Sequence, residues 1–393
     1  MKKEYLLMNK NEKLFSFCID KSPLGEKIYI TREFSDLKPI GFDDINTWLN
    51  RRNCAKHKTH FVKWLKEWNL DTTEGFIDVT HCLGINDTLW VKENGSSLLW
   101  QDVNLYDNQF TDVAQTTCFE TGLNDLQLSS TDLSNIKSPE FTAEGSAPKC
   151  WKKEKEGIYL YKSQLSGSAN SGLEANAEYI SANIARQIVG NKSIPYALGM
   201  FKDKLCSKCK LFTSEKYGYV PFYKFFKNKV YTIGEVINKC EELGYKEDAM
   251  KMFLVDSIIF NQDRHQGNFG FIVDNETFEI KGFAPLFDYN LSMLYAAMPE
   301  DIESLKAFHR YEDEYMVGHK LGGEFSEIGK ALISENNALK EIIPKDIKFP
   351  IHEKYNLDKT RTSKIIDIFE ENLQIMTDKH FYKVDCIASF SKK

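Results

Sequence analysis

The sequence lacks any run of about 18 apolar residues, the length that a membrane-spanning helix needs. We therefore expect no membrane span. It also lacks a basic excess, because 57 Asp and Glu outnumber 51 Lys and Arg and the formal net charge is −6. Tight nonspecific binding to nucleic acid depends on a concentrated basic surface. We therefore expect no direct nucleic-acid binding.

Cysteine patterns of the kind that build disulfide frameworks or zinc sites are also missing. The nine cysteines are scattered and odd in number, which is typical of reduced thiols in a cytoplasmic protein. Cys206 and Cys209 form the one CxxC pair, and no second ligand pair follows at zinc spacing. We therefore expect these two cysteines to lie on a strand and not in a zinc site. The apolar patch Tyr5–Met8 is too short for a secretory signal. The expected location is the cytoplasm.

The composition is that of a globular protein. The 393 residues are 42% hydrophobic and 13% aromatic, enough to bury a core, and the length suggests two or three domains. Changes in residue texture predict an N-terminal α+β region over 1–135, a strand-rich lobe over 136–225 and a helical lobe over 226–393. The predicted fold class is α+β.

Apolar periodicity predicts the individual elements. In the N-terminal region we expect strands at Leu14–Ile19, Lys27–Ile30 and Thr88–Val91, helices at Asp43–Arg51 and Lys58–Trp68, and a connector at Thr121–Ser138. Further along we expect strands at Gly157–Tyr161, Leu205–Thr213 and Tyr217–Phe222, helices at Glu174–Val189, Met250–Phe260, Phe325–Leu332 and Lys364–Met376, and a hairpin of Phe269–Val273 with Phe278–Phe283. The rest of the chain to Lys393 is predicted to be mostly helical.

The segment with the clearest chemistry is Asp263-Arg-His-Gln-Gly-Asn268, which follows an apolar helix and precedes the hairpin. Phosphoryl transfer needs a carboxylate that accepts the proton of the nucleophile, and oxygen ligands that hold Mg²⁺ against the phosphates. Asp263 and Asn268 have the Asp-x4-Asn spacing that kinases use on one tight loop. Asp288 follows 20 residues after Asn268, where the returning hairpin can bring it to the same metal ion.

Each of these residues also has a purely structural interpretation. Asp and Asn are common in loops, so Asp263 could be a turn former and Asp288 a helix cap. The apolar helix, the hairpin and the second Asp together favour the catalytic interpretation.

A lysine upstream supplies a further part of such a site. Lys162 ends the apolar strand and can reach nucleotide phosphates, with a helical Glu as its partner. Glu174 and Glu178 lie one helical turn apart and both could face it. We prefer Glu178 because it lies deeper in the helix. Without this context, Lys162 would be a solvated lysine at a strand end.

The small-residue loop Thr142–Lys149 precedes that strand. Gly145 and Ala147 would let backbone amides approach phosphate oxygens. The loop matches neither GxxxxGK[ST] nor GxGxxG. An ordinary surface turn is the alternative interpretation.

Taken in order, these pieces resemble the HipA-like serine/threonine kinases of bacterial toxin–antitoxin systems and their relatives, over about residues 139–335. The matching pieces are Gly145-Ser-Ala-Pro-Lys149, the Lys162 strand, the Glu178 helix, Leu211-Phe-Thr-Ser214, Asp263–Asn268 and Ala284-Pro-Leu-Phe-Asp288. The loop Asp-Arg-His-x-x-Asn also resembles phosphoinositide kinases. Those lack the Gly-Ser-Ala-Pro-Lys loop and usually continue with Asp-Phe-Gly, whereas Asp288 is followed here by Tyr289-Asn290.

The resemblance implies a kinase-like two-lobed fold that binds ATP and Mg²⁺ between the lobes. Asp263 would be the catalytic base, Asn268 and Asp288 the Mg²⁺ ligands, and Lys162, paired with Glu178, the phosphate-binding lysine. The nucleotide would also contact the phosphate loop (Gly145, Ser146, Ala147, Lys149) and a hinge that reads adenine through its backbone (Leu211, Phe212, Thr213). Family members autophosphorylate a Ser of the phosphate loop. Thr142 stands at that position here, and Ser146 is the nearest serine.

The expected function is phosphorylation of a Ser or Thr hydroxyl on the chain itself or on another protein, with a toxin-like role in growth control and a small antitoxin-like partner implied by the family. The region 1–135 would then be a partner substitute or a substrate-selecting module. Two other classes stay open. One is a lipid or small-molecule kinase that uses the same loop. The other is a non-catalytic regulator or DNA-binding partner that keeps the fold.

Overall fold

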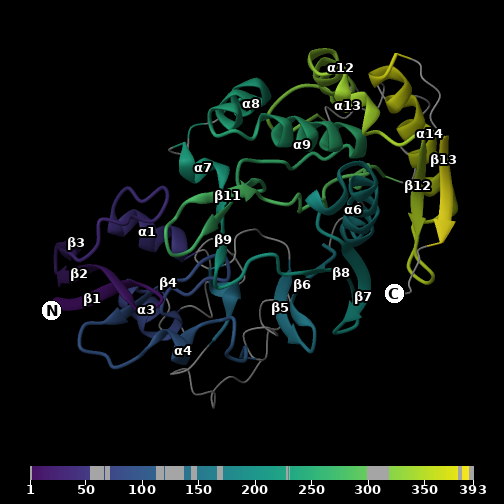
Figure 1. The fold of residues 1–393 in the computed structure, drawn as a ribbon. Helices are drawn as coiled ribbons and strands as arrows, with labels where there is room; N and C mark the ends of the chain where they lie inside the picture. The colour runs from purple at the N-terminus through teal and green to yellow at the C-terminus, as the bar shows by residue number, and fades with distance from the viewer. Residues whose placement is uncertain are drawn as a thin grey trace.

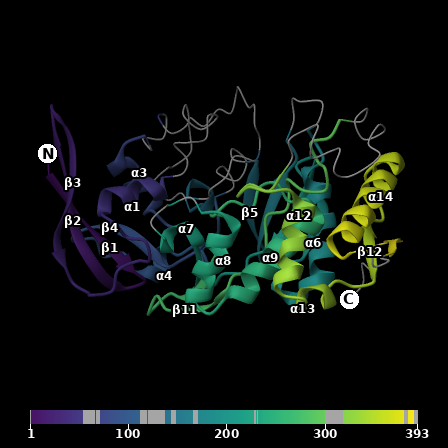
Figure 2. The same ribbon diagram turned by 90° about the horizontal axis from the view of Figure 1, so that it is seen from above.

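The computed structural model describes residues 2–53, 66, 71–111, 119, 137–142, 148–165, 171–226, 229, 231–298, 318–378 and 383–388. Across these residues it combines antiparallel sheets with packed helices (Figures 1 and 2). The predicted α+β class is confirmed. None of the described helices is long and apolar enough to cross a membrane.

The N-terminal region is built on a four-stranded antiparallel sheet of order β3-β2-β1-β4. Its elements are β1 (Lys2–Asn9), β2 (Glu12–Ser22), β3 (Gly25–Glu33), α1 (Ile45–Arg52), α3 (Thr73–Thr80), β4 (Leu89–Glu93) and α4 (Trp100–Val103). The central strand β1 buries the continuous run Tyr5–Met8, because both of its faces are covered. What resembled a short apolar patch is thus a core strand.

A second four-stranded sheet, of order β5-β6-β8-β7, forms the strand-rich lobe. It consists of β5 (Lys149–Glu154), β6 (Gly157–Ser163), β7 (Tyr196–Phe201) and β8 (Lys204–Lys210), and α6 (Glu174–Val189) packs against it, followed by the 3-10 turn η5 (Gly190–Lys192). A similar turn, η4 (Pro139–Phe141), precedes β5. Cys206 and Cys209 lie three residues apart on β8 and therefore face opposite sides, both buried as free thiols. Among the described residues, no cluster of metal-ligating side chains occurs.

The remaining elements form a helical lobe with a small three-stranded sheet, of order β11-β10-β9, at its base. The strands are β9 (Tyr217–Pro221), β10 (Gly270–Asp274) and β11 (Ile280–Phe283), and the helices are α7 (Phe222–Phe225), α8 (Ile233–Glu242), α9 (Lys246–Ile259), α12 (Phe325–Glu335), α13 (Ala338–Glu341) and α14 (Lys359–Met376). Helix α9 is buried nearly all round and forms the centre of the largest core.

The prediction of a mostly helical C-terminal part was wrong in one respect. Strands β12 (Asp346–Ile351) and β13 (Lys383–Ala388) form a parallel pair, connected through α14. In β12 the buried Ile347 and Phe349 alternate with exposed Asp346 and Lys348, which is the two-residue period of a strand. The pair stands at the edge of the molecule beside α14 (Figure 1).

Several predicted elements agree closely with the structure. Helices were predicted at Asp43–Arg51, Glu174–Val189 and Phe325–Leu332, and α1, α6 and α12 lie there. The predicted strand Leu205–Thr213 ends earlier, at Lys210, where the chain leaves the sheet. Almost all of the predicted helix Lys58–Trp68 and of the connector Thr121–Ser138 lies outside the described residues.

Candidate active site

A cleft of about 570 Å³ lies where the N-terminal region, the strand-rich lobe and the helical lobe meet. It is lined by most of the described residues that the sequence singled out, namely Thr142, Lys149, Lys162, Leu211, Phe212, Asp263, Asn268 and Asp288. Trp48, Arg51 and Arg52 of α1 also line it. The sequence had given no sign that the N-terminal region reaches the site.

Lys162 lies near the end of β6, in register with Lys149 on one side and Ser207 on the other. Its Nζ is 2.7 Å from Glu178 Oε1 and 2.6 Å from Asp288 Oδ1. Burial alone would lower the pKa of Lys162, but the carboxylates of Asp288 and Glu178 outweigh it and hold the pKa above its usual value. The lysine is therefore a fixed cation.

Of the two glutamates left open, Glu178 is the partner of Lys162. It is completely buried on α6, and Ser207 Oγ donates a hydrogen bond to its second oxygen. Glu174 has another task, since its Oε2 accepts hydrogen bonds from the backbone amides of Leu165 (3.2 Å) and Gly172 (3.1 Å).

The loop that follows α9 begins with Phe260 in the left-handed conformation (φ 57°), which ends the helix and turns the chain towards the cleft. Asn268 Nδ2 donates to the carbonyl of Asp263 at 3.1 Å, so Oδ1 is the amide atom that can ligate a cation. Burial, together with the nearby Asp288 carboxylate, raises the pKa of Asp263 above its usual value. The charges of His265, Lys320 and Arg264 act in the opposite direction.

Asp288 follows β11 and has a left-handed backbone (φ 62°), a conformation that residues other than glycine rarely adopt. Burial would raise the pKa of Asp288, but the Lys162 ammonium reverses this and holds it below its usual value. The structure thus brings Asp288, Lys162 and Glu178 into direct contact, and Asp263 and Asn268 into the same cleft.

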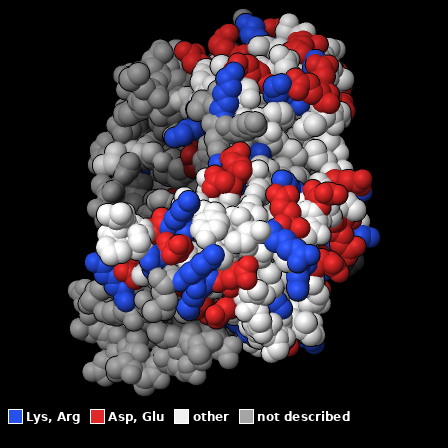
Figure 3. All heavy atoms as spheres, turned by 90° about the vertical axis from the view of Figure 1, so that its left-hand side faces the viewer, with Lys and Arg blue, Asp and Glu red and all other residues white. Residues whose placement is uncertain are grey.

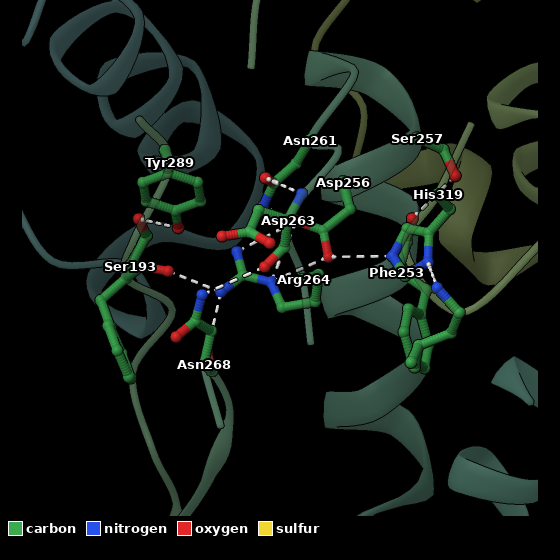
Figure 4. A network of polar contacts seen from close by, with 12 residues as sticks. Ser193, Phe253, Asp256, Ser257, Asn261, Asp263, Arg264, Asn268, Tyr289 and His319 are labelled. Atoms are coloured by element: carbon green, nitrogen blue, oxygen red, sulfur yellow. Dashed lines mark hydrogen bonds and ion pairs between the residues drawn. The ribbon is translucent and has the colours of Figure 1, made fainter. Parts of the chain in front are cut away.

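Arg264 is a structural partner that the sequence reasoning missed. Its side chain is completely buried and forms a bidentate ion pair with Asp256 of α9, with Nε at 2.9 Å from Oδ2 and Nη2 at 3.0 Å from Oδ1 (Figure 4). Its Nη1 donates to the carbonyls of Asn268 (2.8 Å) and Phe287 (2.5 Å). One guanidinium therefore ties the loop of Asp263 to the residue before Asp288.

A sequence signal for this pair did exist. Asp256 interrupts the apolar run of α9, and a charge on an otherwise buried helix needs a partner. Its carboxylate also accepts from Asn261 Nδ2 at 2.9 Å. Burial would raise the pKa of Asp256, but Arg264 outweighs this and lowers it.

The predicted hinge lies between β8 and β9. The backbone amide of Leu211 donates to the carbonyl of Ile158 at 2.8 Å, and Thr213 Oγ1 donates to the Ile85 carbonyl at 2.7 Å. The Phe212 ring packs edge-to-face against Tyr219 and lies tilted against Phe287. The segment is therefore fastened to both the strand-rich lobe and the N-terminal region.

The structure describes only part of the predicted phosphate loop, Thr142–Lys149. Gly145, Ser146 and Ala147 lie outside the described residues. Thr142 is half-buried, and its Oγ1 donates to the carbonyls of Leu83 (2.8 Å) and Pro139 (3.3 Å). Lys149 lines the cleft and its charge helps to lower the pKa of Asp288.

The residues present suit a magnesium nucleotide. A carboxylate (Asp288) and an amide oxygen (Asn268) are hard ligands of the kind that Mg²⁺ takes alongside phosphate oxygens. The left-handed backbone at Asp288 and the Arg264 hydrogen bonds hold these ligands on one side of the cleft. Lys162 is a fixed cation of the kind that binds phosphates.

The site is thus a cleft between a strand-rich and a helical lobe, with a buried lysine held by two carboxylates. No family model matches the chain. A curated protein, the serine/threonine-protein kinase CtkA of Helicobacter pylori, is 29% identical over 127 residues, covering 28% of this chain. The match spans only 38% of the length of that kinase.

Two solved structures are similar in outline. The crystal structure of the Helicobacter pylori proinflammatory kinase CtkA has a TM-score of 0.46 and 17% identity, covering 60% of this chain and 90% of that one. HipA of Shewanella oneidensis, in a complex of the toxin–antitoxin system with HipB and operator DNA, has a TM-score of 0.49 and 12% identity, covering 95% and 97%. The partial similarity to a serine/threonine-protein kinase agrees with the kinase motifs of the sequence.

Proposed function

We propose that the protein is an ATP- and Mg²⁺-dependent serine/threonine protein kinase of the HipA-like type. The observation that carries the proposal is the contact of Lys162 with both Glu178 and Asp288, in the cleft that Asp263 and Asn268 also line. The similarity to a curated serine/threonine kinase supports it.

In this proposal each residue has one role. Lys162 neutralises and orients the nucleotide phosphates, and Glu178 holds Lys162 in position. Asp263 accepts the proton of the attacking hydroxyl, for which its raised pKa gives it basicity. Asn268 and Asp288 would hold Mg²⁺, which when bound supplies charge neutralisation between the phosphates. Leu211, Phe212 and Thr213 would read the adenine through the backbone.

The finer parts of the proposal concern regulation and setting. Autophosphorylation on Thr142 or Ser146, a toxin-like role and an antitoxin-like partner follow from the family resemblance, and the HipA relative was solved with HipB and DNA.

On the face in Figure 3 the blue and red side chains lie interspersed. We propose a cytoplasmic setting, where the free thiols that the structure buries would stay reduced; these are Cys18, Cys82, Cys150, Cys206, Cys209 and Cys240.

The alternatives predict different products. A lipid or small-molecule kinase would transfer phosphate to a non-protein hydroxyl and label no protein. A non-catalytic regulator would transfer none. The Lys162 contacts favour an active phosphotransferase over the regulator, because a retained charged cluster of this kind has a cost in desolvation.

The test is incubation of the full chain with γ-labelled ATP and Mg²⁺, alone and with a cell lysate, followed by mapping of phosphosites. Asp263→Ala is expected to lower transfer on the order of 100-fold or more. Asp367→Ala, which changes an exposed aspartate of α14, is the matched control and is expected to behave as the wild type. Near-normal transfer by folded Asp263→Ala protein would contradict the assigned base, and wild-type protein that labels no protein would contradict the protein kinase.

A further inference from the structure

Three of the cations in or beside the cleft are already paired with carboxylates. Lys162 is balanced by two carboxylates, and Arg264 is buried and occupied by Asp256 and two carbonyls. Arg52 of α1 pairs with Asp87 at 2.6 Å. A phosphoryl group in transfer carries negative charge that a positioned cation stabilises. These three side chains are already committed elsewhere.

Lys320 is different. It is exposed at the cleft and lines it together with Asp263. Within the part of the chain that the structure describes, no carboxylate forms an ion pair with it. It lies near enough to Asp263 for its charge to act on that carboxyl group. Lys320 therefore presents a positive charge beside the proposed catalytic base.

The backbone around Lys320 is held in a tight turn. His319 N donates to the Gly323 carbonyl at 3.1 Å, and Gly322 N donates to the His319 carbonyl at 2.8 Å. Gly322 and Gly323 have φ values of 95° and 99°, which strongly favour glycine. The turn thus fixes the direction in which the Lys320 side chain extends from the backbone.

The neighbouring His319 anchors this turn in the core. Its Nδ1 accepts a hydrogen bond from the amide of Leu321 at 3.1 Å, so the ring hydrogen is on Nε2. Nε2 faces Asp256 Oδ2 at 3.6 Å, an electrostatic contact longer than a hydrogen bond, with both side chains fully buried (Figure 4). The ring also packs edge-on against Phe253 and Phe325.

Asp256 is therefore shared by two segments of the site. The same carboxylate binds Arg264, which follows Asp263, and contacts His319, which precedes Lys320. Asp263 and Lys320 are each one residue away from a side chain fixed on Asp256. This common anchor sets the position of Lys320 relative to the base.

We propose that Lys320 is a further catalytic residue, which contacts the phosphoryl group that is transferred. The inference rests on the proposed kinase function. In the step, the bond between the γ-phosphorus and the oxygen of the leaving ADP breaks, and a bond to the acceptor oxygen forms. The hydroxyl proton passes to Asp263. Lys320 takes no part in this proton transfer and acts only through its charge and its hydrogen bonds.

The experiment compares Lys320→Ala and Lys320→Arg with Lys330→Ala, which removes an exposed lysine of α12 that does not line the cleft. Transfer from γ-labelled ATP gives kcat and KM, and calorimetry gives the affinities for Mg-ATP and Mg-ADP. Lys320→Ala is expected to lower kcat on the order of 10-fold or more. Lys320→Arg is expected to recover most of this loss, because it keeps the charge.

Nucleotide affinities separate a phosphate contact from a structural role. Lys320→Ala should weaken ATP binding about two- to fivefold, the range of an exposed charge pair, and leave ADP binding unchanged. A Lys320→Ala protein with kcat within about twofold of Lys330→Ala overturns the inference, and so does an equal loss for ATP and ADP. If wild-type protein transfers no phosphate, the proposed function fails separately, and the ATP-over-ADP preference still decides whether Lys320 meets the terminal phosphate.

Discussion

Two buried charge clusters lie in or beside the cleft, one around Lys162 and one around Arg264, and they differ in their access to solvent. The side chains of Lys162, Glu178 and Asp288 are 10%, 0% and 24% exposed, so this cluster opens into the cleft at Asp288. Arg264 and Asp256 are both 0% exposed. One cluster opens into the cleft, and the other is closed to solvent.

This difference indicates two kinds of work. In the proposed kinase, Lys162 would exchange Asp288 for a nucleotide phosphate, because Glu178 remains with it. Arg264 has no such alternative, since its other partners are the backbone carbonyls that it holds in position. A removed partner should therefore cost affinity in the first cluster and stability in the second.

The largest effect is expected for Asp256→Asn. It leaves Arg264 buried with an uncompensated charge, which typically costs about 3–5 kcal/mol in the free energy of unfolding. Denaturant unfolding measures it. The matched control is Asp248→Asn, which changes another aspartate of α9 and breaks its exposed ion pair with Lys192. This variant should lower the free energy of unfolding by about 1 kcal/mol or less. Equal losses for the two variants would contradict the comparison.

The same variant should change the pH dependence of stability. The pKa of Asp256 is lower in the folded than in the unfolded chain, because Arg264 outweighs the effect of burial. Its contribution is therefore complete above the unfolded pKa of about 3.9 and is lost as the pH falls through the folded pKa. Wild-type protein should lose stability faster than Asp256→Asn protein below about pH 4.

Asp288→Asn tests the open cluster and should have a smaller effect of a different kind. It removes one carboxylate ligand, so Mg-ATP affinity should fall on the order of tenfold by calorimetry. The free energy of unfolding should change by less than about 1 kcal/mol, because Lys162 keeps Glu178. Unchanged Mg-ATP affinity would make Asp288 only a structural residue.

The smallest expected effect concerns Thr142. A carboxylate in Thr142→Asp would face the carbonyls of Leu83 and Pro139, which now accept the threonine hydroxyl, and would also repel nucleotide phosphates. ATP affinity should fall about two- to fivefold, as for one exposed charge pair. Thr142→Val removes the hydrogen bonds without adding charge and is the control. Mass spectrometry after incubation with Mg-ATP checks phosphate on Thr142 and Ser146. Its absence from both, with unaltered affinity in Thr142→Asp, would exclude this regulation.

Residues with a local spacing signal could be found from the sequence. Asp263 and Asn268 share one loop, and the hairpin makes the return to Asp288 predictable. Glu178 could be preferred over Glu174 by its depth in α6. The position of the α1 side chains in the cleft could not be found, because it depends on how the N-terminal region packs against the hinge.

The fold shows the same limit. Elements with a clear helical period, such as α6, were predicted with the correct bounds, whereas β12 and β13 were missed. Parallel strands pair over a long separation in sequence, so neither carries a turn signal that announces the other. Strand β1 was missed because burial on both faces removes the alternation that identifies a strand.

The hydrogen bonds between the N-terminal region and the hinge bear on the mechanics of the protein. The Ile85 carbonyl accepts from Thr213 of the hinge, and the next carbonyl, that of Asn86, accepts at 2.7 Å from the amide of Tyr219 on β9, beyond the hinge. Two consecutive peptide groups of the N-terminal region thus bridge the connection between the lobes and stiffen it. A rotation of the two lobes that separates Thr213 from Tyr219 has to break one of these hydrogen bonds. A rotation that preserves both hydrogen bonds must move the N-terminal sheet together with the lobes.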